Sequence, residues 1–184
     1  MEILKTCLHT HHLALGAQMT PFAGYDMPIE YTGLDAEHSA VRTCAGVFDV
    51  SHMGEVDIKG AQALAYVNHI FTNDVSTLPD GGCIYGMMTA PDGGTVDDLL
   101  VYRRSDSDFM LVINAANIAK DLAWIRDNAK GWNVEITDRC CDYAQLALQG
   151  PESERILNEV LGIDGSDLGF YTFKTLEDLS LIHI

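Results

Sequence analysis

Basic residues are scarce in this sequence. Its 184 residues include 11 Lys and Arg against 27 Asp and Glu, which gives a formal net charge of −16 at pH 7. A protein that binds the phosphate backbone of nucleic acid needs a basic surface, so this charge argues against a nucleic-acid partner. Acidity of this size mainly serves solubility and does not identify a function by itself.

Long apolar runs and targeting segments are also missing. No run approaches the roughly 20 residues that cross a bilayer, so we expect no membrane partner. The first twelve residues, MEILKTCLHTHH, contain no apolar signal-peptide core and no Arg/Ser-rich transit character. These absences predict a cytoplasmic protein, whose length suits one domain with a substantial core.

Paired cysteine motifs are absent as well. The five cysteines are odd in number, irregularly spaced and without a C-x-x-C pair. This pattern favours reduced thiols over a disulfide framework or a zinc site. Cys7 and His11 stand one helical turn apart beside two further histidines, but no second Cys/His pair at ligand spacing follows. We therefore expect no metal.

A serine-hydrolase elbow, G-x-S-x-G, does not occur. Asp49, Ser51 and His52 suggest a catalytic triad at first sight. However, Ser51 and His52 are adjacent in an expected strand, and adjacent strand residues point to opposite faces. We assign them no hydrolytic role.

Strand and helix signals alternate along the chain. Hydrophobic periodicity predicts helices over 3–16, 34–45 (capped by Asp35), 61–71, 115–130 and 151–161, and strands over 47–59, 83–89, 95–103, 109–114, 132–137 and 144–148. Residues 18–33 are turn-rich and suit an extended surface segment. Short turns between the central strands predict antiparallel hairpins. The fold class is therefore α+β, a mostly antiparallel or mixed sheet with covering helices.

A strand, a glycine and a helix follow one another twice, at Gly60 and at Gly150. The two copies have related periodicity. They indicate either two halves of one α+β domain or a coincidence, and the pattern alone does not choose between them.

The stretch GGTVDDLLVY (Gly93–Tyr102) carries the clearest chemical signal. Its glycine turn leads into a strand in which alternate residues share a face. Asp98 thereby joins Leu100 and Tyr102 on one face, and Asp97 lies on the other. A carboxylate on an apolar face is costly unless it is paired, and its pKa is easily moved, as acid/base chemistry requires. The alternative is a pair of solvated turn aspartates.

Further stretches recur with this one in a fixed order. They are FAGYDMPIEY (Phe22–Tyr31), VRTCAGVFDVSHMGE (Val41–Glu55), TNDVSTLPDGGCIYGMM (Thr72–Met88), GGTVDDLLVY and VINAANIAKDLAWI (Val112–Ile125), followed by LQGPES. From about residue 8 to about residue 175 they resemble the T-protein of the glycine cleavage system, a tetrahydrofolate-dependent aminomethyltransferase. The resemblance is more specific than any single motif and favours a site role for the aspartates.

The resemblance implies a fold and an activity. Members of that family have three domains in a clover-like arrangement with folate in a central cavity. Residues 1–178 resemble an incomplete N-terminal folate-binding domain, without the later R-T-G-Y-T-G-E-D-G-F-E-like segment and its glutamate. The family transfers a methylene unit from the aminomethyl-lipoyl arm of H-protein to tetrahydrofolate and releases ammonia. We expect the piece alone to be inactive.

Site residues follow from the same resemblance. Asp98 falls at the position of the family's catalytic aspartate, which lies near N10 of tetrahydrofolate. An anionic carboxylate there would stabilise positive charge that develops on nitrogen. The positions that line the folate pocket in the family correspond to Met53, Tyr85, Leu100, Tyr102, Asn114 and Tyr171.

The last six residues, 179–184 (LSLIHI), do not resemble the family's continuation. They match the translation of CTG TCT CTT ATA CAC ATC, the end of a common sequencing adapter. We therefore expect a non-native tail, with a natural apolar tail as the alternative.

Two other functions of the protein also stay open. One is a non-catalytic folate-binding module of a tRNA-modification or iron–sulfur maintenance relative, and the other is the folate half of a dimethylglycine or sarcosine dehydrogenase.

Overall fold

A computed structural model describes residues 3–176 and 182–183. They form two compact units. The first unit comprises residues 3–52 and 144–167, and the second comprises 53–143, 168–176 and 182–183. None of the helices in the described part of the chain is long and apolar enough to cross a membrane.

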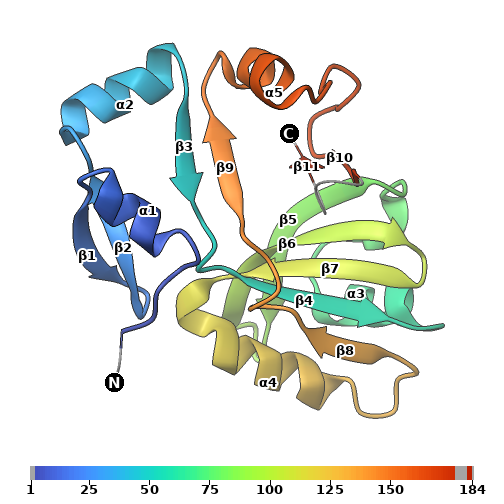
Figure 1. Cartoon of the computed structure of the whole chain (residues 1–184). Coiled ribbons are helices and arrows are strands. Elements are labelled where there is room, and N and C mark those ends of the chain that lie inside the picture. The colour runs from blue at the N-terminus through green and yellow to red at the C-terminus, as the bar shows by residue number, and fades with distance from the viewer. Residues whose placement is uncertain (1–2, 177–181, 184) are drawn as a thin grey trace. The chain divides into compact units, whose positions relative to one another are not determined.

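The second unit is built on a five-stranded sheet of order β5-β6-β7-β4-β8 (Figure 1). Every neighbouring pair is antiparallel, so the predicted hairpins of the central strands are confirmed. The strands are β4 (Gly54–Lys59), β5 (Gly82–Thr89), β6 (Thr95–Ser105), β7 (Asp108–Ile113) and β8 (Glu135–Asp138).

Two helices cover one face of this sheet. They are α3 (Ala63–Ile70) and α4 (Ile118–Asn128), and the short 3-10 helices η1 (Val75–Thr77) and η2 (Ala115–Asn117) precede β5 and α4. Both helices add residues to one core, including Tyr66, Val67 and Ile125. We call this face the helix-covered face. It holds the larger of the unit's two apolar clusters, so it stabilises the sheet that presents the opposite face.

The opposite face, which we call the second face, has a smaller apolar cluster. Tyr102, Met110 and Val112 pack there with Phe173. Phe173 belongs to β10 (Phe173–Lys174), which pairs with β11 (Ile182–His183), and its ring centroid lies 5.3 Å from that of Tyr102. The segment that follows residue 168 therefore packs on the second face.

The first unit contains two small sheets and three helices. A hairpin joins β1 (Gln18–Phe22) to β2 (Tyr25–Glu30), and β3 (Gly46–Asp49) pairs antiparallel with β9 (Leu146–Gln149). The helices are α1 (His9–Ala14), α2 (Leu34–Thr43) and α5 (Ser153–Leu161). Each unit thus contains one of the two strand–glycine–helix copies, β4–Gly60–α3 in the second and β9–Gly150–α5 in the first.

The single strand predicted over 47–59 is wrong. Strand β3 ends at Asp49 and β4 begins at Gly54, in different units. The Asp49 carboxylate accepts a hydrogen bond from the Ser51 backbone N–H at 2.9 Å, which closes a turn between the two strands. The apolar residues over 47–59 predicted one long strand. The hydrogen bond to the Asp49 side chain instead ends β3 in a turn.

The extended segment expected over 18–33 is instead the β1–β2 hairpin. Its two turn residues, Ala23 and Gly24, have φ values of 50° and 86°. Positive φ at both central residues identifies the two-residue hairpin turn whose twist matches that of the flanking strands. Alanine tolerates this conformation poorly, so the residue types at this turn do not signal it.

Helix α1 is shorter than predicted and buries a different face. Leu4 forms a bridge with Tyr25 instead of entering the helix. The buried residues are His9 and His12, whereas Leu13 and Leu15 are exposed. Hydrogen bonds of its histidines to distant segments, and not apolar burial, hold this helix in place.

The Asp35 cap predicted for α2 is absent. The Glu37 carboxylate instead accepts the backbone N–H groups before the helix.

The expected tail over 179–184 falls mostly outside the described residues. Within it the structure describes Ile182 and His183, which form β11 against β10. The non-native origin of this tail, and the domain bounds at 1–178, remain predictions.

Candidate functional site

The alternation predicted for the central strand β6 is confirmed. Asp97, Leu99 and Val101 are buried toward the helix-covered face, and Leu99 and Val101 belong to its core. Asp98 and Leu100 are half-buried on the second face. The two adjacent carboxylates therefore stand on opposite sides of the sheet.

The register of the sheet gathers the predicted residues into adjoining cross-strand rows on the second face. Tyr85 pairs with Leu100, and Leu100 pairs with Val112. In the next rows Met87 pairs with Asp98 and Cys83 pairs with Tyr102. Residues from β5, β6 and β7 thereby form one continuous surface. Tyr85 and Met87 alternate along β5 with Gly86 between them, so they share this face.

Asp98 is held by two side chains from neighbouring strands. The Asn114 amide nitrogen lies 3.2 Å from Asp98 Oδ1 and 2.9 Å from the Asp98 carbonyl oxygen. The Tyr85 hydroxyl donates to Asp98 Oδ2, and this bond raises the pKa of Tyr85. Both donors are neutral groups, so neither forms an ion pair with the carboxylate. A fixed anion of this kind can stabilise positive charge that develops on a bound nitrogen.

Met53 and Asn114 lie at the end of this surface. They flank the paired residues Gly54 and Ile113 of β4 and β7. Met53 packs against the second-face cluster, and Asn114 directly follows β7, so the end of this strand positions its amide. An amide can both donate to and accept from the polar edge of a heterocycle.

Tyr171 completes the set from the segment before β10. Its carbonyl oxygen accepts the Cys83 backbone N–H at 2.9 Å, which ties it to the edge strand β5. Its φ is 55°, a left-handed conformation that is unusual for an aromatic residue. Backbone strain of this kind is found preferentially at ligand sites. The structure therefore brings all seven predicted residues to the second face or to its edge.

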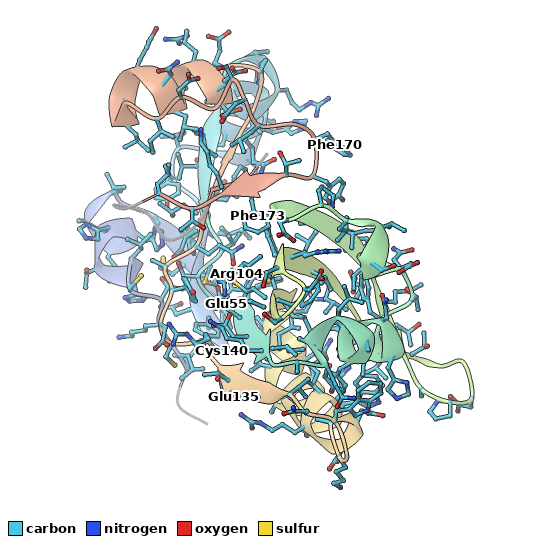
Figure 2. All side chains as sticks on the ribbon, turned by 90° about the vertical axis from the view of Figure 1, so that its right-hand side faces the viewer. Glu55, Arg104, Glu135, Cys140, Phe170 and Phe173 are labelled. Atoms are coloured by element: carbon cyan, nitrogen blue, oxygen red, sulfur yellow. The ribbon has the colours of Figure 1, made fainter. Side chains whose placement is uncertain are left out.

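Sequence reasoning missed a second carboxylate on this face. Glu55 pairs with Val112 in the β4–β7 ladder, so it extends the row of Tyr85 and Leu100. Its side chain is buried, with only 3% of the residue exposed, and Oε2 meets no hydrogen-bond partner in the described chain. In Figure 2 Glu55 lies beside Cys140, whose Sγ donates to the Glu55 carbonyl oxygen at 3.6 Å. The alternation of Glu55 and Asp57 with Val56 and Ile58 was the available signal.

Burial decides the charge state of Glu55. It raises the pKa of this carboxyl to about 7, and the nearby Asp138 adds to the effect. Asp57, on the same strand and face, is instead neutralised by Arg104, whose Nη1 lies 2.8 Å from its Oδ1. The second face therefore has one carboxyl group that exchanges its proton close to neutral pH.

Glu55→Gln should stabilise the protein in alkaline solution. A carboxyl whose pKa is raised in the folded state loses stability as pH rises from its unfolded pKa toward its folded pKa. The rise from the ordinary value of 4.5 to about 7 corresponds to about 3 kcal/mol. The variant should therefore exceed the wild type by about this free energy of unfolding at pH 8 and match it near pH 4, in urea titrations. Glu135→Gln, at an exposed position of β8 (Figure 2), is the control. An equal gain at both pH values would contradict this assignment.

The described part of the chain contains no group of three or more His, Cys, Asp or Glu side chains that could hold a metal ion. Two of the N-terminal histidines are instead bound to carboxylates. His9 Nε2 lies 2.8 Å from Asp26 Oδ2, and His12 Nε2 lies 2.8 Å from Asp49 Oδ2.

Comparison with known proteins gives consistent matches. The family model described as GCVT N-terminal domain matches residues 8–183. The aminomethyltransferase of Desulfitobacterium hafniense (strain Y51) is 47% identical over 94% of this chain and 47% of its own length. The aminomethyltransferase of Moorella thermoacetica is 49% identical over 92% of this chain and 46% of its own.

A solved structure matches over the same extent. The glycine cleavage system aminomethyltransferase T from Bartonella henselae is 31% identical, with a TM-score of 0.89, and the match covers 94% of this chain and 47% of that one. The chain therefore spans about half the length of the relatives that it matches.

Proposed function

The chain belongs to the GCVT N-terminal domain family, and on this premise we propose that it supplies a folate-binding wall and the catalytic carboxylate of a tetrahydrofolate-dependent aminomethyltransferase. The observation that carries the proposal is Asp98, which neutral donors hold on a face lined by apolar and aromatic residues. The named relatives support the same activity.

Each residue of the face has a role in this proposal. Leu100 and Met53 offer apolar contact to the pterin and benzoyl rings, and Tyr85 and Tyr171 offer aromatic faces. Tyr102 is buried against Phe173, so it supports this wall from within. Asn114 meets a polar edge of the pterin and holds Asp98. Asp98 faces the folate nitrogen that attacks the aminomethyl carbon, and it stabilises the positive charge that forms on that nitrogen.

The partners follow from the reaction. The methylene unit comes from the aminomethyl group on the lipoyl arm of H-protein, and ammonia leaves as the unit passes to tetrahydrofolate. Tetrahydrofolate is a co-substrate here, and the proposal involves no metal. We place the whole protein in the cytoplasm.

A chimera tests the activity. Residues 8–175 of this chain, joined to the remaining half of the Moorella thermoacetica relative, should release ammonia from aminomethylated H-protein when tetrahydrofolate is present. The unaltered relative is the positive control. A folded chimera that binds tetrahydrofolate without any transfer would favour the non-catalytic folate-binding module.

The chain by itself should bind tetrahydrofolate weakly. Ligand sites enclose most of a ligand, and the second face forms one wall. We propose that the remaining contacts come from the half of the relatives that this chain does not match. Two missing charge-assisted hydrogen bonds, at about 1.5–3 kcal/mol each, weaken binding by roughly two to four orders of magnitude. Titration calorimetry of the chain and of the chimera measures this difference, and equal affinities would contradict it.

A further inference from the structure

A second carboxyl pair lies behind the proposed catalytic residue, on the helix-covered side of the sheet. Asp97 on β6 is 5% exposed, and Asp121 in the first turn of α4 is completely buried. Isolated carboxylates are rarely buried to this degree, because the loss of hydration is costly. Their burial therefore requires an explanation.

The hydrogen bonds around the pair are unevenly distributed. Asp97 Oδ1 accepts from the side-chain amides of Asn114 at 3.1 Å and Asn117 at 2.9 Å. Asp97 Oδ2 and both oxygens of Asp121 accept no hydrogen bond from any donor group in the described residues. Three acceptor oxygens thus lie buried without a hydrogen bond, and among the described residues only Asp121 Oδ1 has a cation beside it, Lys120 Nζ at 3.5 Å.

A shared proton resolves this arrangement. One proton between the two carboxyl groups provides the missing donor and removes one of two buried negative charges. Burial, followed by the hydrogen bond and repulsion from Asp97, raises the pKa of Asp121 to about 7. Although burial opposes it, hydrogen bonding from Asp121, Asn114 and Asn117 lowers the pKa of Asp97. The proton therefore belongs mainly to Asp121, and Asp97 carries the charge.

The charged Asp97 is connected to Asp98 through a single side chain. The Asn114 amide nitrogen that lies 3.1 Å from Asp97 Oδ1 also lies 3.2 Å from Asp98 Oδ1. A negative Asp97 holds this amide with its nitrogen between the two aspartates. We propose that Asp97 and Asp121 share one proton and that this pair acts as a positioning device, which orients Asn114 and through it Asp98. The functional part of this inference rests on the function proposed above for Asp98.

Three further titratable groups lie around the pair. On α4, Lys120 Nζ is 3.5 Å from Asp121 Oδ1. It donates instead to the Val96 carbonyl oxygen, and its side chain is half exposed. On the far side of the sheet are Asp98 and, bonded to it, Tyr85. The ion pair with Lys120 lowers the pKa of Asp121, but it leaves Asp121 Oδ2 and Asp97 Oδ2 without a donor in the described residues, and the shared proton supplies one.

Infrared spectroscopy of the full chain detects the proton directly. With aspartate carboxyl groups labelled by ¹³C, a protonated aspartate gives a C=O stretching band that glutamates do not share. We expect one such carboxyl group per chain at pH 6, where ordinary aspartates are ionised. Asp121→Asn should remove the band. Asp98→Asn should keep it, as should Asp127→Asn, a control at an exposed position of the same helix. The absence of the band from the folded wild type, or its persistence in Asp121→Asn, would overturn the shared proton.

NMR of the Asn114 side-chain amide tests the positioning role. Its ¹⁵N–¹H resonances should titrate with a midpoint near pH 7 in the wild type and in Asp127→Asn, and lose this titration in Asp121→Asn. Because Asn114 donates directly to Asp97, an amide that does not titrate in the wild type overturns the positioning role. Neither experiment uses folate or activity. An inactive chimera with an intact band and titration would therefore refute the function proposed for Asp98 and leave the shared proton standing.

Discussion

Asp98→Asn should reduce methylene transfer by the chimera about 10²–10³-fold, the usual loss when one preorganised electrostatic group is removed. The substitution is nearly isosteric. The single carbonyl oxygen of Asn can still accept from Asn114, and its NH2 group can donate to the Tyr85 hydroxyl oxygen, so the fold should survive. What the substitution removes is the negative charge of Asp98 itself. Ammonia release from aminomethylated H-protein is the measurement.

The comparison with Asp97→Asn makes this result specific. Asp97 lies on the other face and acts through Asn114, so its loss should cost less transfer per folded molecule. Asp127→Asn provides an exposed control. If Asp97→Asn and Asp98→Asn caused equal losses, the assignment of Asp98 as the catalytic residue would fail.

Alanine at Gly60 or Gly150 should destabilise the unit that contains it by about 2–6 kcal/mol, as the sum of backbone strain and steric overlap. Gly60 has φ 136° and Gly150 has φ 125°. A Cβ atom would lie 2.5 Å from the backbone oxygen of Asn133 in the first case and of Cys44 in the second. Backbone oxygens held in neighbouring segments cannot easily move away.

Gly131→Ala separates strain from overlap. Gly131 also has positive φ, at 90°, but a Cβ there would meet nothing within 4 Å. Its substitution should cost only about 1–2 kcal/mol. Urea unfolding of the three variants measures the difference. If Gly60→Ala and Gly150→Ala were no more destabilising than Gly131→Ala, the close approach of a neighbouring backbone oxygen would not be the reason that glycine is required after these two strands.

The central sheet could be predicted because its determinants are local. The strands β5, β6 and β7 are joined by short turns, and their side chains alternate with period two. That alternation is also sufficient to place Asp98 and Asp97 on opposite faces. The family resemblance, and not the pattern, singled out Met53, Asn114 and Tyr171.

The features that the sequence did not predict depend on contacts between residues far apart in the chain. The face that α1 buries depends on His12, which binds a carboxylate 37 residues away. The shared proton joins residues on β6 and α4, a contact that only the folded sheet creates. Glu55 was overlooked because its neighbours in the sequence resemble an ordinary strand, and its burial depends on strands that pair with it from elsewhere.

The most direct test of the central claim is methyl NMR of the chain titrated with tetrahydrofolate, because it detects weak binding and locates it. Met53 and Leu100 line the second face, whereas Met88 and Leu111 are buried in the helix-covered core. We predict that the methyl signals of Met53 and Leu100 shift with added tetrahydrofolate and that those of Met88 and Leu111 shift much less. Shifts confined to other parts of the chain, or no shift of Met53 and Leu100 at saturating tetrahydrofolate, would contradict a folate-binding second face.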